Sequence, residues 1–355
     1  MESKTRNSNI ELLRLVLMVF VVLLHFNNDT MGGAFVLVNN LPVENAILHV
    51  VEAFSICAVN CFMIVSGYFL FTNTKIRFGK IVDVLLIVIF YRFFDYFGRL
   101  FFLHESFSFH HLIACFLPAN YFAIFYVVCY LFSPFIAKLF RDCSEKTAHF
   151  LMGTLLFVFI IIPTFLDIAI DLNIFKDPGY LSPISSLGNA SGYTIVQFFT
   201  MLCLGMWIRK TEFNPKTWIL LLVYCVSSIC IWILENRAFA LNYDFIFNVL
   251  AAVSLFLLFN KITIQNNIIN FAAKSCFAIF CIHTGQFANT IWKNFLIQPE
   301  HFENGIVLSV SWMLLCVFAM FFTCLAISII CRCIFGKIKG FIVDRFSVLI
   351  VDDEE

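Results

Sequence analysis

Long apolar segments separated by short polar or Pro/Gly-containing stretches are the feature that most constrains this chain. There are ten of them, at about residues 10–27, 46–71, 82–103, 120–137, 148–168, 193–208, 217–234, 244–259, 275–292 and 306–330. Several approach the roughly 20 residues that an α-helix needs to cross about 30 Å of hydrocarbon. The sequence therefore predicts an all-α fold, a polytopic transmembrane helical bundle with about ten spans.

The overall composition excludes several other classes of protein. Apolar residues make up 61% of the chain and charged residues 13%, against about 45–50% and about 25% in a soluble domain. The net charge is zero, and no basic arm or phosphate-binding glycine motif is present, so we expect no nucleic-acid partner. The 14 cysteines include no Cys-x-x-Cys pair, which favours packing roles over a disulfide or metal framework, and we expect no metal site.

The distribution of basic residues predicts the topology. If the N-terminus is cytoplasmic, the inner connections hold 17 of the 23 lysines and arginines, and the outer loops hold three. This asymmetry is the one that the positive-inside rule describes, and it predicts that both termini are inside. No cleavage site follows the first apolar run, which we expect to remain as the first span. We predict one membrane domain over residues 1–355, with a cytoplasmic tail at 331–355.

The first span contains an arginine and a histidine that need an explanation, because an ionisable group inside a span costs on the order of 2.5–3.5 kcal/mol. Ser8-Asn9-Ile10-Glu11 resembles a capping box that would start the helix near Asn9. Arg14 and His25 are eleven residues apart, so they lie within about 20° of one helical face. The residues alone leave two interpretations open: a functional face, or an arginine that snorkels inward and a histidine at the outer interface.

Other spans also carry polar groups. Glu52 in the second span, with Ser55 and Asn60 following, could line a cavity or form interhelical hydrogen bonds. In the third span, Arg92, Asp95 and Arg99 have the spacing of an ion-pair ladder on one helical face, an interpretation that we favour over a substrate site. The ninth span is expected to be continuous and to carry His283 near mid-membrane, with Gln286 and Thr290 at helical spacing.

Four motifs in these segments together resemble the signature of the membrane-bound acyltransferase type 3 family. They occur in family order over nearly the whole chain: Ile10 to Arg14 with His25, Asn60 to Leu70 with its Ser66-Gly67-Tyr68 ending, Phe125-Tyr126 with Tyr130 and Pro134, and Ser275 to His283. Any one of them alone is weak evidence, but their combination is specific. Two departures are notable: Phe280 stands where the family usually has tyrosine, and the inner loop from Lys75 to Lys80 lacks the usual Arg-x-x-Arg-x-x-Pro ending.

This resemblance implies an O-acyltransferase of bacterial sugars or polysaccharides. Its members transfer acetyl or related acyl groups from cytoplasmic acyl-CoA, here a co-substrate, to hydroxyls of cell-surface or lipid-linked saccharides. We therefore expect a protein of the bacterial inner membrane, whose partners are acyl-CoA, a saccharide or lipid-linked glycan acceptor, and membrane lipids.

The resemblance also assigns roles to particular residues. His25 would be the base and Arg14 would contact the coenzyme or its thioester, while Arg77 and Lys80 would hold the phosphates at the inner mouth. Further candidates for the substrate cavity are Glu52, Ser66, Tyr126 and His283.

Two rival functions would also suit a bundle with intramembrane charges. A transporter, flippase or polymerase of saccharide lipids commonly has repeated halves and Gly/Pro-broken spans at matching positions, and the sequence indicates neither. A non-catalytic membrane scaffold would leave the spacing of Arg14 and His25 unexplained.

Overall fold

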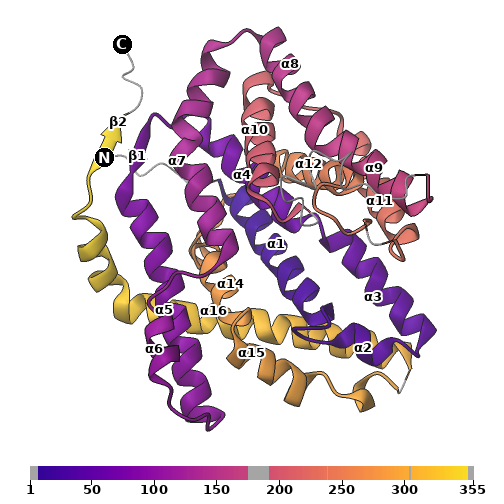
Figure 1. The fold of residues 1–355 in the computed structure, drawn as a ribbon, viewed down its shortest axis with the longest axis vertical. Helices are drawn as coiled ribbons and strands as arrows, with labels where there is room; N and C mark the ends of the chain where they lie inside the picture. The colour runs from indigo at the N-terminus through magenta and orange to yellow at the C-terminus, as the bar shows by residue number, and fades with distance from the viewer. Residues whose placement is uncertain (1–6, 175–191, 238, 304, 351–355) are drawn as a thin grey trace. The chain divides into compact units, whose positions relative to one another are not determined.

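The computed structural model describes residues 7–174, 192–237, 239–303 and 305–350, and almost all of its regular structure is helical (Figure 1). Each of the ten predicted apolar segments is helical, so the all-α prediction is confirmed. In the described ranges, the strands are β1 (Lys75–Arg77) and β2 (Val348–Ile350), which pair in a two-stranded sheet. Most of the segment between the fifth and sixth predicted spans, and the last five residues of the predicted tail, lie outside the described residues.

The chain forms two compact units, the first made of residues 1–55, 77–124 and 264–348. Its elements are α1 (Ser8–Asn27), α2 (Ala34–Val38), α3 (Pro42–Ser55), α5 (Phe78–Phe102), α6 (Phe109–Ala114), α13 (Asn267–Ala272), α14 (Cys276–His283), α15 (Gln286–Ile291) and α16 (Ile306–Val343), with short 3-10 or π turns at Ala273–Ser275, Trp292–Leu296 and Pro299–His301. Helix α16 packs against both α1 and α14, as Figure 1 shows. The core of this unit includes Leu13, Leu17 and Phe26 of α1, which are fully buried.

The second unit consists of residues 56–76, 125–263 and 349–355. It contains α4 (Ala58–Leu70), most of α7 (Tyr121–Asp142), α8 (Glu145–Leu156), a π turn (Phe157–Ile161), α9 (Ile162–Asp171), α10 (Ile195–Thr211), α11 (Thr217–Ile233) and α12 (Ile246–Asn260). Helices α4 and α10 pack closely because Gly67 and Gly205 lie where they meet. Small residues of this kind let membrane helices approach until their backbones touch.

A buried polar network also joins helices within the second unit. Asn60 of α4 donates to the carbonyl oxygen of Tyr243 at 2.7 Å and to Asn248 Oδ1 of α12 at 3.3 Å. Gln197 of α10 donates in turn to Asn60 Oδ1 at 3.1 Å. Of the two interpretations of Asn60, the structure therefore supports interhelical hydrogen bonding.

Length and composition alone identify fewer candidate spans among the described residues than the ten expected. Within the described ranges, five helical stretches are long and apolar enough to cross a membrane: Ser8–Asn27, Pro42–Leu70, Tyr121–Asp142, Glu145–Asp171 and Ile306–Val343. A bent pair, Asn267–His283 with Gln286–Leu296, makes six if it is one span. Helix α5 carries five charged residues, while α10, α11 and α12 have 17, 17 and 15 residues. At 1.5 Å per residue, 15–17 residues reach only about 22–26 Å.

Candidate functional site

Helix α1 begins at Ser8, but the expected capping box does not form. Asn7 is the N-cap residue and makes no side-chain capping bond. Glu11 instead pairs with Arg14, with 2.8 Å between Oε2 and Nη1. The hydroxyl of Ser8 accepts a hydrogen bond from the amide of Asn266 at 2.9 Å. A full positive charge one turn away attracts the glutamate more strongly than a neutral backbone amide does, which explains the difference from the sequence pattern.

The other ionisable group of α1, His25, lies against the second histidine that the sequence singles out. His25 Nδ1 is 2.8 Å from Nε2 of His283, at the end of α14. His283 is fully buried, whereas His25 is partly exposed. Two histidines named from different spans thus form one pair within the first unit.

The backbone of α14 fixes the proton arrangement of this pair. Nδ1 of His283 is 2.6 Å from the carbonyl oxygen of Ile279, which can only accept, so His283 Nδ1 carries a proton. In the neutral pair, His283 Nε2 is therefore an acceptor and His25 Nδ1–H donates to it. The remaining nitrogen of His25, Nε2, then has an open lone pair. This is the arrangement that a general base requires.

Two phenylalanine rings lie beside the two histidines. The ring centroid of Phe280, on α14, is 6.4 Å from that of His25 and 6.0 Å from that of His283. Phe122 adds a further ring 5.6 Å from Phe280. Phe280 is the position at which the family-like motif usually has tyrosine, so the ring contact is present here without a hydroxyl.

Helices α1 and α14 are in contact within the first unit, and His25 of α1 meets His283 at the end of α14. Arg14 forms its ion pair with Glu11 of its own helix. The position of Arg14 and His25 on one functional face stays a prediction.

The ninth apolar segment is not the continuous helix that was expected. It bends by 70° between α14 and α15, at Thr284 and Gly285, directly after His283. Gln286 and Thr290 consequently belong to a different helix from His283. A single span that is broken at a glycine differs from the Gly/Pro-broken spans at matching positions that transporters commonly show.

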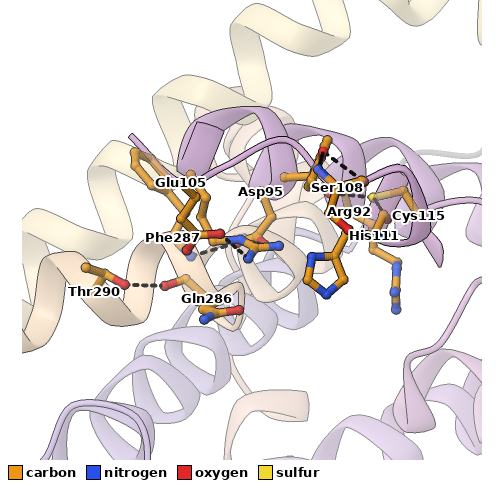
Figure 2. Close-up of polar contacts among 11 residues, drawn as sticks. Arg92, Asp95, Glu105, Ser108, His111, Cys115, Gln286, Phe287 and Thr290 are labelled. Atoms are coloured by element: carbon orange, nitrogen blue, oxygen red, sulfur yellow. Dashed lines mark hydrogen bonds and ion pairs between the residues drawn. The ribbon is translucent and has the colours of Figure 1, made fainter. Parts of the chain in front are cut away.

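One charged residue of α5, Asp95, contacts the helix that follows this bend, as Figure 2 shows, and it belongs to the predicted ion-pair ladder. Asp95 Oδ2 is 3.2 Å from Arg99 Nε, and Arg99 Nη1 is 2.8 Å from Glu105 Oε2. Arg92 instead donates to the carbonyl oxygen of Ala119 at 3.3 Å. The predicted ladder therefore forms between Asp95 and Arg99 and continues to Glu105 rather than to Arg92.

Comparison with known proteins identifies the family. A family model described as an acyltransferase domain, that of acyltransferase type 3, matches residues 7–331, which is nearly the whole chain. The chain belongs to the acyltransferase type 3 family. A search of curated proteins and a search of solved structures found no match. The protein is thus a membrane acyltransferase, and the histidine pair lies within the matched region.

The other residues predicted for the site of this acyltransferase lie in several places. Glu52 of α3 is buried and accepts a hydrogen bond from Asn27 Nδ2 of α1 at 2.8 Å. Arg77 and Lys80 are exposed at the beginning of α5, in the same unit as Arg14. The structure thus brings Glu52 into an interhelical hydrogen bond beside the C-terminal end of α1.

Ser66 and Tyr126 belong to the second unit of the acyltransferase. The hydroxyl of Ser66 donates to the carbonyl oxygen of Phe62 in its own helix at 2.9 Å. Tyr126 is half-buried on α7. Their assignment to a substrate cavity stays a prediction.

Sequence reasoning missed the role of Asp95 and Gly285 beside the histidine pair. Asp95 was recognised only as part of an ion-pair ladder, although Oδ1 accepts a hydrogen bond from the amide of Phe287 at 2.8 Å. The signal that could have found this contact is Thr284-Gly285, because a glycine after an intramembrane histidine can mark a broken helix. The position of Asp95 on α5, by contrast, has no sequence pattern around it that would predict this contact.

Proposed function

We propose that this acyltransferase transfers an acetyl or related acyl group from acyl-CoA to a hydroxyl of a cell-surface or lipid-linked saccharide, with His25 as the general base. The observation that carries the proposal is the 2.8 Å contact between His25 Nδ1 and His283 Nε2. It orients a neutral imidazole with Nε2 unprotonated. Membership of the acyltransferase family supplies the reaction class.

Transfer from a thioester to an alcohol requires one proton to be moved twice. His25 Nε2 takes the proton of the acceptor hydroxyl while its oxygen attacks the thioester carbonyl carbon. His283 Nε2 stabilises the resulting imidazolium by accepting the hydrogen bond from His25 Nδ1. When the carbon–sulfur bond breaks, His25 returns the proton to the leaving thiolate, so that an ester and free coenzyme A are the products.

The basic residues of the first unit suit the donor substrate. Glu11 engages one terminal nitrogen of Arg14, and the Arg14 side chain retains 31% of its exposed surface. A guanidinium that cannot lose its charge is suited to bind an anionic group of the coenzyme or the developing oxyanion. Arg77 and Lys80 have the charge and exposure needed to bind phosphates at the inner mouth.

The bend at Gly285 is also typical of transporters, whose discontinuous helices often form the substrate site. The family match favours acyl transfer, because it extends over the residues on both sides of the bend. The donor, the saccharide acceptor and the location in a bacterial inner membrane follow from the family resemblance. They form part of the proposal.

The test compares histidine variants in a reconstituted assay. Purified protein in nanodiscs would be supplied with radiolabelled acetyl-CoA and an extracted saccharide acceptor. We expect His25→Gln to lower turnover by at least about a hundredfold, the usual contribution of a general base, while binding of acetyl-CoA is retained. Turnover of the parent protein should fall at acid pH, because a protonated His25 cannot accept the proton.

His49→Gln is the matched control. His49 lies in α3 of the same unit and stacks on Phe35, with ring centroids 4.4 Å apart. It should therefore lose packing and keep turnover near that of the parent. Near-normal turnover of His25→Gln would rule out His25 as the base and make His283 the next candidate.

A further inference from the structure

The bend after His283 creates a structural problem that the chain has to solve. Helix α14 ends at His283, and α15 begins at Gln286 after only Thr284 and Gly285. The first amides of a helix have no partner within that helix. Inside a membrane each such amide costs several kcal/mol unless another group accepts its hydrogen bond. A bend at this point therefore needs a partner from another element.

Asp95 of α5 supplies that partner, as Figure 2 shows. Its Oδ1 accepts the amide hydrogen of Phe287 at 2.8 Å. The approach is so close that a Cβ on Gly285 would lie 2.4 Å from the same oxygen. The φ and ψ of Gly285 are −69° and 155°, an extended conformation open to any residue. Glycine is thus required here by the position of Asp95 and not by the backbone.

The other carboxylate oxygen of Asp95, Oδ2, forms an ion pair with Arg99. Arg99 contacts Oδ2 through Nε and reaches Glu105 through Nη1. These contacts orient the carboxylate and balance its charge, which lowers the cost of burying it among the helices. A Cβ added at Gly98 would lie 3.0 Å from the ring of Phe287. Helices α5 and α15 therefore also pack tightly beside the hydrogen bond between Asp95 and Phe287.

We infer that Asp95 is a positioning residue that clamps the bend between α14 and α15 and so holds His283 against His25. The clamp acts on the backbone four residues beyond His283, and the short Thr284-Gly285 link leaves little slack between them. This inference rests on the proposed role of the histidine pair. Asp95 itself contacts neither histidine among the described contacts, so it acts through the chain.

A set of variants tests the clamp by turnover. Asp95→Ala should lower kcat by about tenfold or more, since a displacement on the order of 1 Å can cost up to a hundredfold, and leave KM for acetyl-CoA unchanged. Asp95→Asn should restore most of the kcat, because its amide oxygen can still accept from Phe287. In a His283→Gln background, Asp95→Ala should cost little more, because residues that act through one another are not additive.

A second measurement does not depend on activity. Hydrogen exchange of a peptide containing the Phe287 amide should be faster in Asp95→Ala than in the parent. Asp83→Ala is the matched control, because Asp83 is an aspartate of the same helix that pairs with Lys339 at 2.6 Å. Its exchange at Phe287 should equal that of the parent. If Asp95→Ala fails to fold, Gly285→Ala serves instead, because its methyl group would displace the same oxygen.

The outcomes separate the clamp from the proposed function. Unchanged hydrogen exchange at the Phe287 amide in Asp95→Ala would overturn the clamp. So would a loss of kcat on Asp95→Ala that is as large in the His283→Gln background as in the parent. A rise in KM with unchanged kcat would also overturn it, because Asp95 would then bind substrate. Normal turnover of His25→Gln would overturn the proposed base, while the exchange measurement would still report on the clamp.

Discussion

The contact between α4 and α10 allows a sharp prediction about stability. A Cβ at Gly67 would lie 2.0 Å from the carbonyl oxygen of Leu202, and one at Gly205 would lie 2.2 Å from that of Ile64. Both obstacles are helix backbone, which cannot rotate away as a side chain can. Gly67→Ala would therefore have to separate the two helices by about 1 Å to reach the 3.0 Å below which Cβ contacts essentially never occur.

The size of the effect follows from this displacement. Overpacking of a well-packed interior typically costs about 1–3 kcal/mol, and a clash with backbone belongs at the upper end. The better helix propensity of alanine offsets this by at most about 1 kcal/mol. A net loss of about 2 kcal/mol would lower the melting temperature by roughly 4–8 °C, at about 2–4 °C for each kcal/mol in a domain of 150–250 residues.

The assay is thermal unfolding of purified protein in detergent. Size-exclusion chromatography measures how much folded protein remains at each temperature. Gly153→Ala is the matched control, because Gly153 is also inside a helix but has no atom within 4 Å of its added Cβ. It should raise the melting temperature slightly, by helix propensity alone. Equal melting temperatures for Gly67→Ala and Gly153→Ala would show that α4 and α10 do not meet at these glycines.

Two further predictions concern the charges. Arg14→Lys keeps the positive charge but loses the planar fork of hydrogen-bond donors. We therefore expect normal expression and a rate of acyl transfer reduced about tenfold or more. A full rate of acyl transfer would indicate that Arg14 only snorkels to the inner headgroups. For topology, cysteines introduced at Lys75 and Lys339 in a background without native cysteines should not react with an impermeant reagent added outside, and labelling at Lys339 would mean that the number of spans is odd.

The helices were predictable because apolar length is a local property. A run such as residues 306–330 has to be removed from water whatever its neighbours are, and the corresponding α16 extends from Ile306 to Val343. The number of spans was less predictable. Helix α12 is apolar but only 15 residues long, so whether it crosses depends on tilt, local membrane thickness and neighbouring helices.

The bend in the ninth segment shows what local pattern cannot supply. The run from Cys276 to Trp292 reads as one apolar helix, and Gly285 is a single residue that many helices tolerate. The break is stabilised by Asp95, which is 192 positions away from Phe287 in the chain. A hydrogen bond over that separation has no counterpart in the periodicity of either segment.

The same reasoning applies to the intramembrane polar groups as a class. Their cost predicts that each must have a partner or a function, but the identity of the partner decides between the two. Glu52 meets Asn27 and Asn60 meets Asn248, which are contacts between helices, and Asn60 also meets Tyr243 in the turn before α12. His25 differs from them, because His283 is itself tied to an acceptor-only carbonyl at Ile279. That second contact sets the direction of the first and leaves His25 with an unused basic nitrogen, which a purely structural pair would not require.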